Sequence, residues 1–256
     1  MSEENKIERW KGRNSNKDRL RGKIWSSLED TQVAIGNPWS TIPNFVGAAE
    51  AANRLSTLAV WKKANTVKVN PDAAQGPLRL LALQAGKKVF TPVPELVKDF
   101  PYILLDPEAL TEKGIAFEDV MYSKGAMEFG QRCNFSDITP LDICVCGCVA
   151  VTRAGGRTGK GAGFADLEQA LFRLYGVVNS STPVMTTVHD IQVVEDELVV
   201  MQGHDTPLNI IVTPTELIET NTDYPEPGPL EWDKLQPDQF ENIPFLNDLK
   251  AELLNK

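Results

Sequence analysis

Residues 155–167 combine five glycines, two cations and one carboxylate, a composition typical of a loop that binds phosphate. Because glycine has no Cβ atom, backbone N–H groups in such a loop can converge on an anion. The run follows an almost continuous apolar stretch over 143–151, which predicts a strand buried on both faces. It leads into 164–175, where apolar residues recur at helical spacing, so the unpaired N–H groups of a first helical turn would join the same site.

The charged residues of this run match the requirements of phosphoryl chemistry. Arg157 and Lys160 would form charge-assisted hydrogen bonds with phosphoryl oxygens. Asp166 lies in the first turn of the predicted helix and could hold Mg²⁺, directly or through water, because Mg²⁺ prefers oxygen ligands. The run therefore predicts a site for phosphate and Mg²⁺, with a flexible glycine-rich turn as the alternative.

Two common nucleotide-binding motifs do not fit the run. A P-loop needs a hydroxyl residue after its lysine, and here Lys160 is followed by Gly161. A dinucleotide fingerprint needs G-x-G-x-x-G, whereas residues 159–163 read G-x-G-x-G. The predicted phosphate site is therefore neither a P-loop nor a Rossmann fingerprint.

The elements that must position this run alternate between strands and helices. Strands are predicted over 66–69, 88–91, 184–188, 191–194, 198–201 and 208–212, with a helix over 77–85. Such alternation is typical of βαβ units, so we expect an α/β fold in three layers, an open, mostly parallel sheet with helices on both faces. Ligands of open α/β sheets bind beyond the carboxyl ends of strands, which is where the glycine-rich run is expected.

A first helix is predicted over 15–30, because apolar residues recur there at i, i+4 and i+8. Lys17 and Arg21 are four residues apart, so they share a different face of this helix. From spacing alone, an ordinary solvated cationic face is an equal alternative to a binding role. A further helix is expected over 46–63, whereas 94–142 is less regular.

Cysteine and histidine give little support for metal or nucleophilic chemistry. Cys144, Cys146 and Cys148 alternate within an apolar run, which favours buried thiols over a metal site. The two histidines, His189 and His204, lack the serine or cysteine context of a nucleophilic triad. We therefore expect structural roles for both histidines.

The composition favours a soluble protein that acts on a small molecule. The chain has 256 residues and a net charge of −9, which disfavours general nucleic-acid or membrane-surface binding. A hydrophobic content of 42% can supply a sizeable core. No apolar stretch approaches the roughly 20 residues of a membrane span, and the first residues show no signal-peptide pattern. We expect a cytoplasmic protein without nucleic-acid or membrane partners.

Four segments of the chain resemble the 5-formyltetrahydrofolate cyclo-ligase (methenyltetrahydrofolate synthetase) family. The family's R-L-G-x-G-x-G-Y-Y-D signature is similar to Arg157-x-Gly159-x-Gly161-x-Gly163-aromatic-x-Asp166, and its N-terminal K-x-x-L-R is similar to residues 17–21. Residues 86–92 resemble its G-K-x-x-x-x-P segment, and residues 204–213 its H-D-x-x-x-D-x-V-V-T segment. The resemblance spans roughly residues 17–219 and fits the divergent methenyltetrahydrofolate synthetase domain-containing group best.

The resemblance implies an activity, its cofactors and its residues. Enzymes of this family use ATP and Mg²⁺ to close 5-formyltetrahydrofolate to 5,10-methenyltetrahydrofolate, phosphorylating the formamide oxygen so that it can leave. Arg157 and Lys160 are then expected to be catalytic, and Asp166 to bind the metal. The expected ATP- and phosphate-binding residues are Lys17, Arg21, Arg157, Gly159, Lys160, Gly161, Gly163 and Phe164. The substrate pocket is expected to be lined by Phe117, Tyr122 and Phe129, with core packing as the alternative for each.

The sequence departs from the family pattern at two places. The paired tyrosines of the signature are Phe164 and Ala165 here, and the family's Glu-x-Thr is absent from residues 70–77. Two interpretations therefore stay open. One is a cyclo-ligase that acts on 5-formyltetrahydrofolate or a related formyl or amide heterocycle; the other is an altered relative that binds nucleotide or folate without that activity. Fold analogy alone leaves a third, a sugar-phosphate or acyl-CoA enzyme.

Three parts are expected along the chain. Residues 1–15 are polar and are predicted to be a mobile segment. Residues 16–220 are predicted to form one cyclo-ligase-like domain. Residues 221–256 are predicted to be a proline-rich extension that ends in a helix over 244–254. The apolar residues of that helix would pack on the domain or on a second copy, which gives a monomer or a homodimer.

Overall fold

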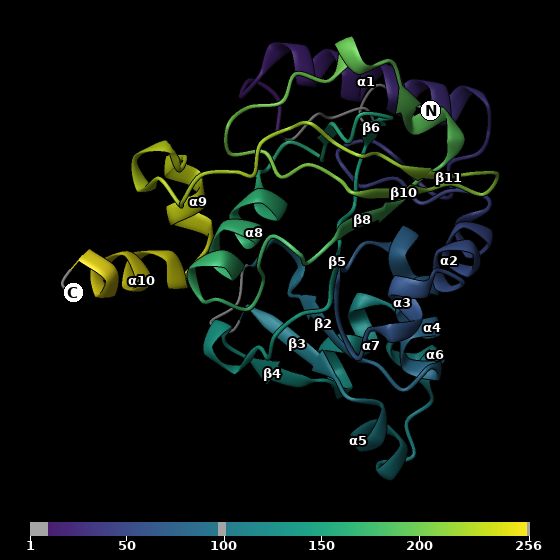
Figure 1. The fold of residues 1–256 in the computed structure, drawn as a ribbon, viewed down its shortest axis with the longest axis vertical. Coiled ribbons are helices and arrows are strands. Elements are labelled where there is room, and N and C mark those ends of the chain that lie inside the picture. The colour runs from purple at the N-terminus through teal and green to yellow at the C-terminus, as the bar shows by residue number, and fades with distance from the viewer. Residues whose placement is uncertain (1–9, 97–100, 255–256) are drawn as a thin grey trace.

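In the computed structural model, which describes residues 10–96 and 101–254, eight strands form a sheet that runs through the middle of the molecule (Figure 1). The central strands, from β10 to β2, are parallel, and the outer strands join them antiparallel. In spatial order the strands are β11 (Leu217–Glu219), β10 (Ile210–Val212), β8 (Val184–Thr187), β5 (Ile143–Val145), β1 (Thr66–Val69), β2 (Lys88–Pro92), β3 (Tyr102–Leu105) and β4 (Gln131–Cys133). The predicted α/β class with a mostly parallel sheet is confirmed.

The centre of the sheet is apolar on both faces because helices cover both. Val67 of β1 lies in register with Val89 of β2 on one side and with Ile143 of β5 on the other. All three side chains are fully buried, and burying a side chain of this size contributes about 1.5–3 kcal/mol relative to exposure. β-Branched residues suit these positions because they pack well on a pleated surface.

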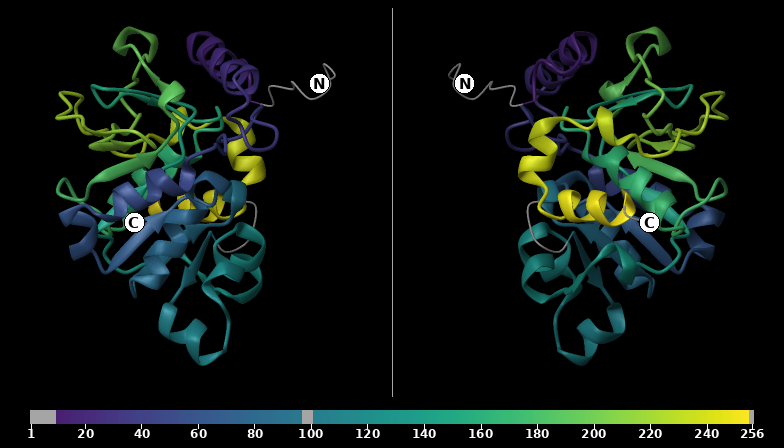
Figure 2. Two further views of the ribbon diagram at one scale, coloured as in Figure 1. Left: turned by 90° about the vertical axis from the view of Figure 1, so that its right-hand side faces the viewer. Right: turned by 90° about the vertical axis from the view of Figure 1, so that its left-hand side faces the viewer.

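Helices cover the two faces of the sheet as separate layers (Figure 1). One layer contains α2 (Ala48–Ser56), α3 (Ala59–Lys63), α4 (Gly76–Gln84), α6 (Phe117–Val120) and α7 (Ser123–Phe129), with α5 (Pro107–Glu112) beyond them. The other face is covered by α8 (Phe164–Leu174), whose apolar cluster is shared by the C-terminal elements α9 (Pro237–Asn242) and α10 (Phe245–Leu254) (Figure 2). The layers are those that the alternation of strands and helices predicts.

A second, smaller sheet carries the first half of the glycine-rich run. It contains β7 (Arg157–Thr158), β6 (Ala150–Thr152) and β9 (Val193–Val194), and α1 (Ser15–Asp30) packs on it. The single strand predicted over 143–151 is therefore wrong, because the chain leaves the main sheet after β5 and enters the small sheet at β6. Side chains of Thr186 and Gln192 donate to the carbonyl groups between the two strands. Backbone N–H groups of Cys146 and Val149 also donate to Met185 and Thr158, so the connection stays buried with its polar groups bonded.

Other expected elements also differ in the structure. The helix expected over 46–63 is broken into α2 and α3, because Leu58 is extended between them. The strand expected over 198–201 is irregular and follows a short 3-10 turn. The described part of 94–142, which showed no regular pattern, contains β3, β4 and short helices. Short elements of this kind are too brief to produce a clear period in the sequence.

The termini of the described chain connect directly to the domain. Residues 10–14 lead into α1, whereas residues 1–9 of the segment predicted to be mobile lie outside the described residues. The helix predicted over 244–254 is α10, whose Leu246 and Leu249 are buried in the domain core. Every helix in the described residues is too short or too polar to span a bilayer.

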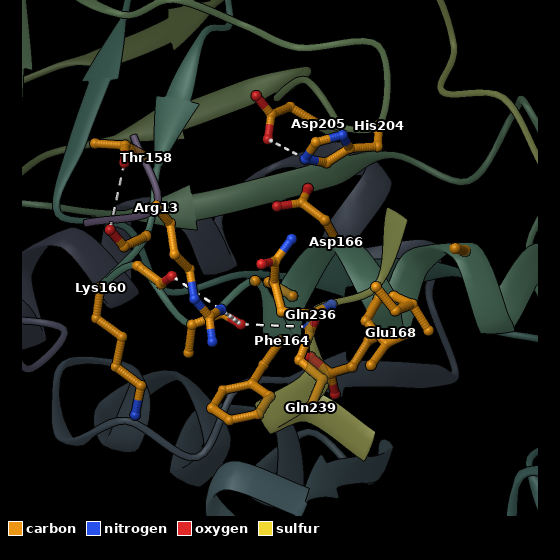
Figure 3. A pocket seen from close by; sticks show the side chains of 18 of the residues that line it. Arg13, Thr158, Lys160, Phe164, Asp166, Glu168, His204, Asp205, Gln236 and Gln239 are labelled. Carbon is orange, nitrogen blue, oxygen red and sulfur yellow. Dashed lines mark hydrogen bonds and ion pairs between the residues drawn. The ribbon is translucent and has the colours of Figure 1, made fainter. Parts of the chain in front are cut away.

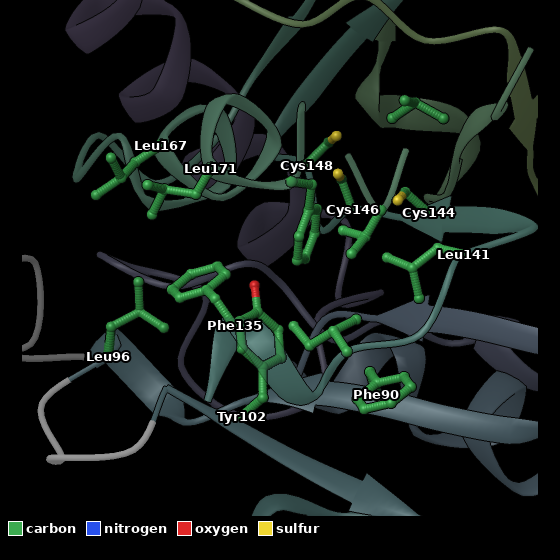
Figure 4. Close-up of a cluster of buried hydrophobic side chains, with 14 of the residues drawn as sticks. Phe90, Leu96, Tyr102, Phe135, Leu141, Cys144, Cys146, Cys148, Leu167 and Leu171 are labelled. Carbon is green, nitrogen blue, oxygen red and sulfur yellow. The ribbon is translucent and has the colours of Figure 1, made fainter. Parts of the chain in front are cut away.

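Cys144, Cys146 and Cys148 lie in the core between the main sheet and α8 (Figure 4). They pack among aromatic and aliphatic side chains of the neighbouring strands and are fully buried. Burial raises the pKa of Cys144 and that of Cys148 to about 12. The prediction of buried thiols is confirmed, and both of these groups are inert because the thiolate is the reactive form.

A polar network is buried in the same core. The Lys68 ammonium of β1 donates to Glu168 Oε2 of α8 at 3.0 Å and also to Asn70 Oδ1. The Tyr102 hydroxyl of β3 donates to Glu168 Oε1. Burial lowers the pKa of Lys68, but the Glu168 carboxylate and the other groups nearby together outweigh burial, and the pKa is raised. One carboxylate therefore joins β1, β3 and α8, and its loss would leave a buried cation unpaired.

This network predicts a difference between single and combined substitutions. Lys68→Met should lower the free energy of unfolding by about 3–5 kcal/mol, because the Glu168 carboxylate stays buried without its cation. The combined variant Lys68→Met/Tyr102→Phe/Glu168→Leu should recover most of that loss, because apolar side chains of similar size replace the whole network. Urea unfolding followed by circular dichroism measures both. A combined variant that is less stable than Lys68→Met would contradict the prediction.

Candidate functional site

The candidate site is a cavity of about 510 Å³ at the carboxyl ends of the central strands. Its lining includes residues 70–72 after β1, Gly147 after β5, and Pro92 and Val93 at the end of β2. In the sheet, β1 lies between β2 and β5. The chain first continues from β1 to β2 on one side and later adds β5 on the other side, so the direction in which strands are added reverses at β1. Open α/β sheets bind their ligands in such a crevice.

The glycine-rich loop, residues 159–163, forms one wall of the cavity between β7 and α8. Gly161 and Gly163 have φ angles of 112° and 76°, which favour glycine. Gly163 is also the N-cap of α8, and no side chain caps that helix end. Within the described part of the chain, the N–H groups of Gly161, Ala162 and Gly163 have no acceptor. An anion at this helix end would therefore find donors without partners.

Arg157, Asp166 and Thr206 join three parts of the chain beside this loop. Arg157 of β7 is 3% exposed, pairs with Asp166 Oδ1 of α8 and donates from Nε to the Thr206 carbonyl at 2.7 Å. The same Asp166 oxygen accepts the Thr206 N–H at 2.9 Å. Burial lowers the pKa of Arg157, but the Asp166 carboxylate and the other acidic groups nearby together outweigh burial, and the pKa is raised. Arg157 is thus a fixed cation at the start of the loop.

Lys17 and Arg21 of α1 both line the cavity, as their common helix face allows. Arg21 is 4% exposed, donates to Thr158 Oγ1 at 3.1 Å and pairs with Asp18. Lys17 pairs with Asp205, which also accepts a backbone N–H. Arg21 is therefore buried against the glycine-rich run, and Lys17 is partly buried beside Asp205, so this face of α1 is not an ordinary solvated one.

Lys160 belongs to the glycine-rich loop and lies near Phe164 of α8 and Asp72 after β1. Its ammonium is 5.7 Å from the centroid of the Phe164 ring, within the range of a cation–π contact. Burial raises the pKa of Asp72 after β1, and the charges of Lys160 and Arg79 oppose that shift only in part. Arg79 is fully buried and donates to the carbonyl groups of residues 70–72, which fixes this turn.

Carboxylates neutralise most cations around the cavity. The ion pairs are Arg13–Asp238, Lys17–Asp205, Arg21–Asp18 and Arg157–Asp166. Buried charges are costly unless they are paired and hydrogen-bonded, so these carboxylates hold the cations in place. An anionic ligand would bind these cations together with the carboxylates or would displace the carboxylates.

Asp166 is suited to contact a metal ion beside bound phosphate. Its Oδ1 accepts both of its hydrogen bonds, and its Oδ2 has no partner among the described residues. In the same residues, no group of three or more His, Cys, Asp or Glu side chains is arranged to hold a metal ion alone. Mg²⁺ would need water and phosphate oxygens as further ligands, which is its usual behaviour in nucleotide sites.

The C-terminal part of the chain completes the wall of the cavity (Figure 3). Residues 228–231, 233–236 and 239 line it. Arg13 donates to the Ala162 carbonyl at 2.6 Å and pairs with Asp238 of α9. Gln239 Nε2 donates to the same carbonyl at 3.4 Å. The glycine-rich loop is therefore held between the residues before α1 and the start of α9.

The structure brings the predicted phosphate-site residues together. Those that line this cavity are Lys17, Arg21, Arg157, Gly159, Lys160, Gly161, Gly163, Phe164 and Asp166. The expected substrate-pocket residues do not line it. Phe117 packs against the apolar cluster on the other face of the sheet, and Tyr122 and Phe129 are 47% and 37% exposed. They belong to the short helices around α6 and α7, whose contacts with α4 and β3 keep them on that face.

Several residues that build the site were missed in the sequence. The sequence could have indicated a special role for Lys68 and Glu168, since each is a charged residue among the apolar residues of a buried strand or helix face. It could also have indicated one for Asp72, because Asp72 follows a central strand at the end where α/β folds bind ligands. It could not have indicated one for Arg13, since the contact of Arg13 with Ala162 joins residues 149 positions apart.

Known proteins that are similar to this chain belong to one family. The sequence profile of the 5-formyltetrahydrofolate cyclo-ligase family matches residues 13–214. A methenyltetrahydrofolate synthase domain-containing protein of Mus musculus is 36% identical over 236 residues, which cover 91% of this chain and 63% of that protein. Its Bos taurus counterpart is 34% identical over 238 residues, covering 92% and 62%. The chain thus spans about three fifths of the length of these curated relatives.

The fold is also similar to a solved structure. The NMR structure of Aquifex aeolicus 5,10-methenyltetrahydrofolate synthetase is 18% identical, with a TM-score of 0.51 and coverage of 85% of this chain and 97% of that chain. At this identity the similarity concerns the fold alone. The profile match, by contrast, includes α1, the glycine-rich loop and the central strands. The chain belongs to the 5-formyltetrahydrofolate cyclo-ligase family.

Proposed function

We propose that the chain is an ATP-dependent, cyclo-ligase-like enzyme that binds the phosphates of MgATP at the glycine-rich loop. Its substrate would be 5-formyltetrahydrofolate or a related heterocycle with a formyl or amide oxygen. The observation that carries the proposal is the uncapped N-terminus of α8, with Arg157, Arg21 and Lys17 in the same cavity. Family membership supports ATP with Mg²⁺ as cofactor and a folate-type small molecule as substrate.

The residues present fit phosphate and Mg²⁺. The N–H groups of residues 161–163 lack acceptors in the described chain, and the dipole of α8 favours negative charge beside them. Arg157 and Arg21 are also oriented by uncharged oxygens, those of Thr206 and Thr158, before any ligand binds. Such preorganised donors suit phosphoryl transfer, which depends mainly on positioning and electrostatic stabilisation.

Each part of the cavity would then have its own role. ATP supplies the phosphoryl group that makes the substrate oxygen able to leave. Arg157 and the loop N–H groups would hold phosphate oxygens, Lys160 would add a second catalytic cation, and Asp166 Oδ2 would face the metal. The substrate would lie at the end of β1, where Asp72 can accept hydrogen bonds from ring N–H groups.

A second candidate is a relative that binds nucleotide without ring closure. The carboxylate partners of Lys17, Arg21 and Arg157 favour it, because they reduce the positive charge available to a transition state. The absence of hydroxyl groups from Phe164 and Ala165 favours it as well. Under either candidate we propose one domain over 16–220, acting in the cytoplasm as a monomer or homodimer without nucleic-acid or membrane partners.

The reaction itself separates the two candidates. Incubation with 5-formyltetrahydrofolate and MgATP should produce an absorbance increase from the methenyl product together with ADP. A panel of formamide-bearing heterocycles tests related substrates by ADP release. MgATP binding without ADP release for any compound would favour the second candidate. Absence of MgATP binding in calorimetry and in thermal shift would contradict both.

Substitution of Arg157 tests the phosphate site. Arg157→Ala should weaken MgATP binding at least about tenfold, because charge-assisted hydrogen bonds to phosphate are lost and each tenfold step is about 1.4 kcal/mol. Isothermal calorimetry on the folded variant measures this. Arg153→Ala is the matched control, since Arg153 pairs with Glu216 on the surface away from the cavity. Equal affinities in the two variants would show that Arg157 does not bind phosphate.

Substitution of Asp166 distinguishes a metal ligand from a simple counterion of Arg157. Asp166→Asn should weaken MgATP binding at least about tenfold if its carboxylate holds the metal ion. Binding of metal-free ATP should not weaken, because the substitution removes a negative charge beside Arg157. Titrations with and without Mg²⁺ compare the two. Wild-type affinity for MgATP in the variant would exclude the metal role.

A further inference from the structure

The segment 228–239 lines the cavity although it lies beyond residues 13–214, which the family profile matches. We call this segment the strap. It begins before the 3-10 turn Trp232–Lys234 and ends in α9. The C-terminal helices lie across one side of the molecule (Figure 2), and Gln236 and Gln239 of the strap lie beside Arg13 (Figure 3).

Polar contacts join the strap to the glycine-rich loop through Arg13. The Arg13 guanidinium donates to the carbonyl of Gly161 at 3.3 Å and to that of Ala162 at 2.6 Å, and it pairs with Asp238 of the strap. Gln239 of the strap is 6% exposed and donates to the Ala162 carbonyl at 3.4 Å. Two consecutive peptide groups of the loop are therefore held by their carbonyl ends.

Peptide planarity carries this effect to the anion site. In a trans peptide the C=O and N–H bonds are fixed in one plane and point in opposite directions. Holding the carbonyl groups of Gly161 and Ala162 therefore also sets the direction of the N–H groups of Ala162 and Gly163. These are among the N–H groups that have no acceptor in the described chain. The strap thus orients donors that it does not touch.

The strap is anchored firmly at one end and weakly over the loop. On its C-terminal side, Ile243, Leu246 and Leu249 are buried in the core beside α8. Over the loop, the paired side chains of Arg13 and Asp238 are 23% and 40% exposed, and exposed ion pairs contribute little to stability. Substitution of Arg13 or Asp238 should therefore remove contacts with the loop without displacing the buried C-terminal anchor.

We propose that Arg13, Asp238 and Gln239 are positioning residues of the binding site, through which the strap orients the N–H groups of Ala162 and Gly163 toward a bound phosphate. The identity of the ligand rests on the proposed function. The orienting contacts do not, because they exist without a ligand. The phosphate site of this chain is therefore complete only with its C-terminal extension.

Three variants of the full chain, Arg13→Ala, Asp238→Asn and Gln239→Ala, test the proposal with two measurements. In calorimetry, the affinity for MgATP should fall about two- to fivefold in Asp238→Asn and about tenfold in Arg13→Ala. In amide hydrogen exchange without ligand, the Leu167 N–H, which donates to the Gly163 carbonyl at the end of the loop, should exchange faster in Arg13→Ala and Gln239→Ala, while β1 and β5 should not change. Lys88→Ala, which breaks an exposed ion pair with Asp106 outside the cavity, is the control and should change neither.

The two measurements keep this inference separate from the proposed function. If the wild-type protein binds no MgATP, the proposed function fails, and hydrogen exchange of the Leu167 amide alone decides the inference. Unchanged exchange of that amide in both Arg13→Ala and Gln239→Ala would overturn it. Faster exchange throughout the main sheet would also overturn it, because these residues would then support the whole fold rather than the loop.

Discussion

The ion pair between Arg157 and Asp166 is the contact on which the candidate site depends. It joins β7 to α8 across the glycine-rich loop, and the Thr206 backbone bonds to both partners. A loop in which Gly161 and Gly163 have positive φ has little stiffness of its own. Because its ends are fixed by an ion pair whose Arg157 is buried, the loop keeps one shape, and the N-terminus of α8 opens into the cavity at a fixed place.

Local charge, rather than net charge, controls this cavity. A net charge of −9 repels anions at long range, so binding of a phosphate depends on the cations that line the site. Those of Arg21 and Arg157 are buried, and a buried cation without a partner is strongly destabilising. Their carboxylate partners keep the fold stable, but they would also compete with the proposed phosphate ligand. A ligand that brought Mg²⁺ would reduce this conflict, because the metal ion would offset the carboxylate of Asp166.

Local patterns in the sequence predicted the parts of the fold that depend on neighbouring residues. The helix expected over 15–30 is α1, and the strand–helix–strand unit expected between 66 and 91 is β1, α4 and β2. The apolar run over 143–151 could not be divided correctly, because β5 and β6 are both buried and hydropathy does not show a change of sheet.

In the candidate site, too, the sequence predicted what depends on neighbouring residues and not what depends on tertiary packing. Lys17 and Arg21 could be assigned to one face because spacing fixes a helix face, and both line the cavity with the glycine-rich loop. The positions of Phe117 and Tyr122 could not be predicted, because they depend on which face of the sheet the short helices cover. Contacts of the strap with the loop depend on tertiary packing across more than half of the chain, for which sequence spacing has no signal.

The two halves of the cavity are attached to different parts of the fold, which explains how a member of this family can keep one and change the other. β7, α8 and α1 build the half proposed to bind phosphate, whereas the turn after β1, with Asp72, builds the other half and is fixed by Arg79. Substitutions at well-separated sites act almost independently, so the loss of Glu-x-Thr after β1 leaves the glycine-rich loop intact. The halves are coupled where Glu168 of α8 bonds to Lys68, which also bonds to Asn70, so substitutions at these residues are expected to affect both halves. The geometry of this chain supports the proposed phosphate site through more contacts than it offers for a folate pocket.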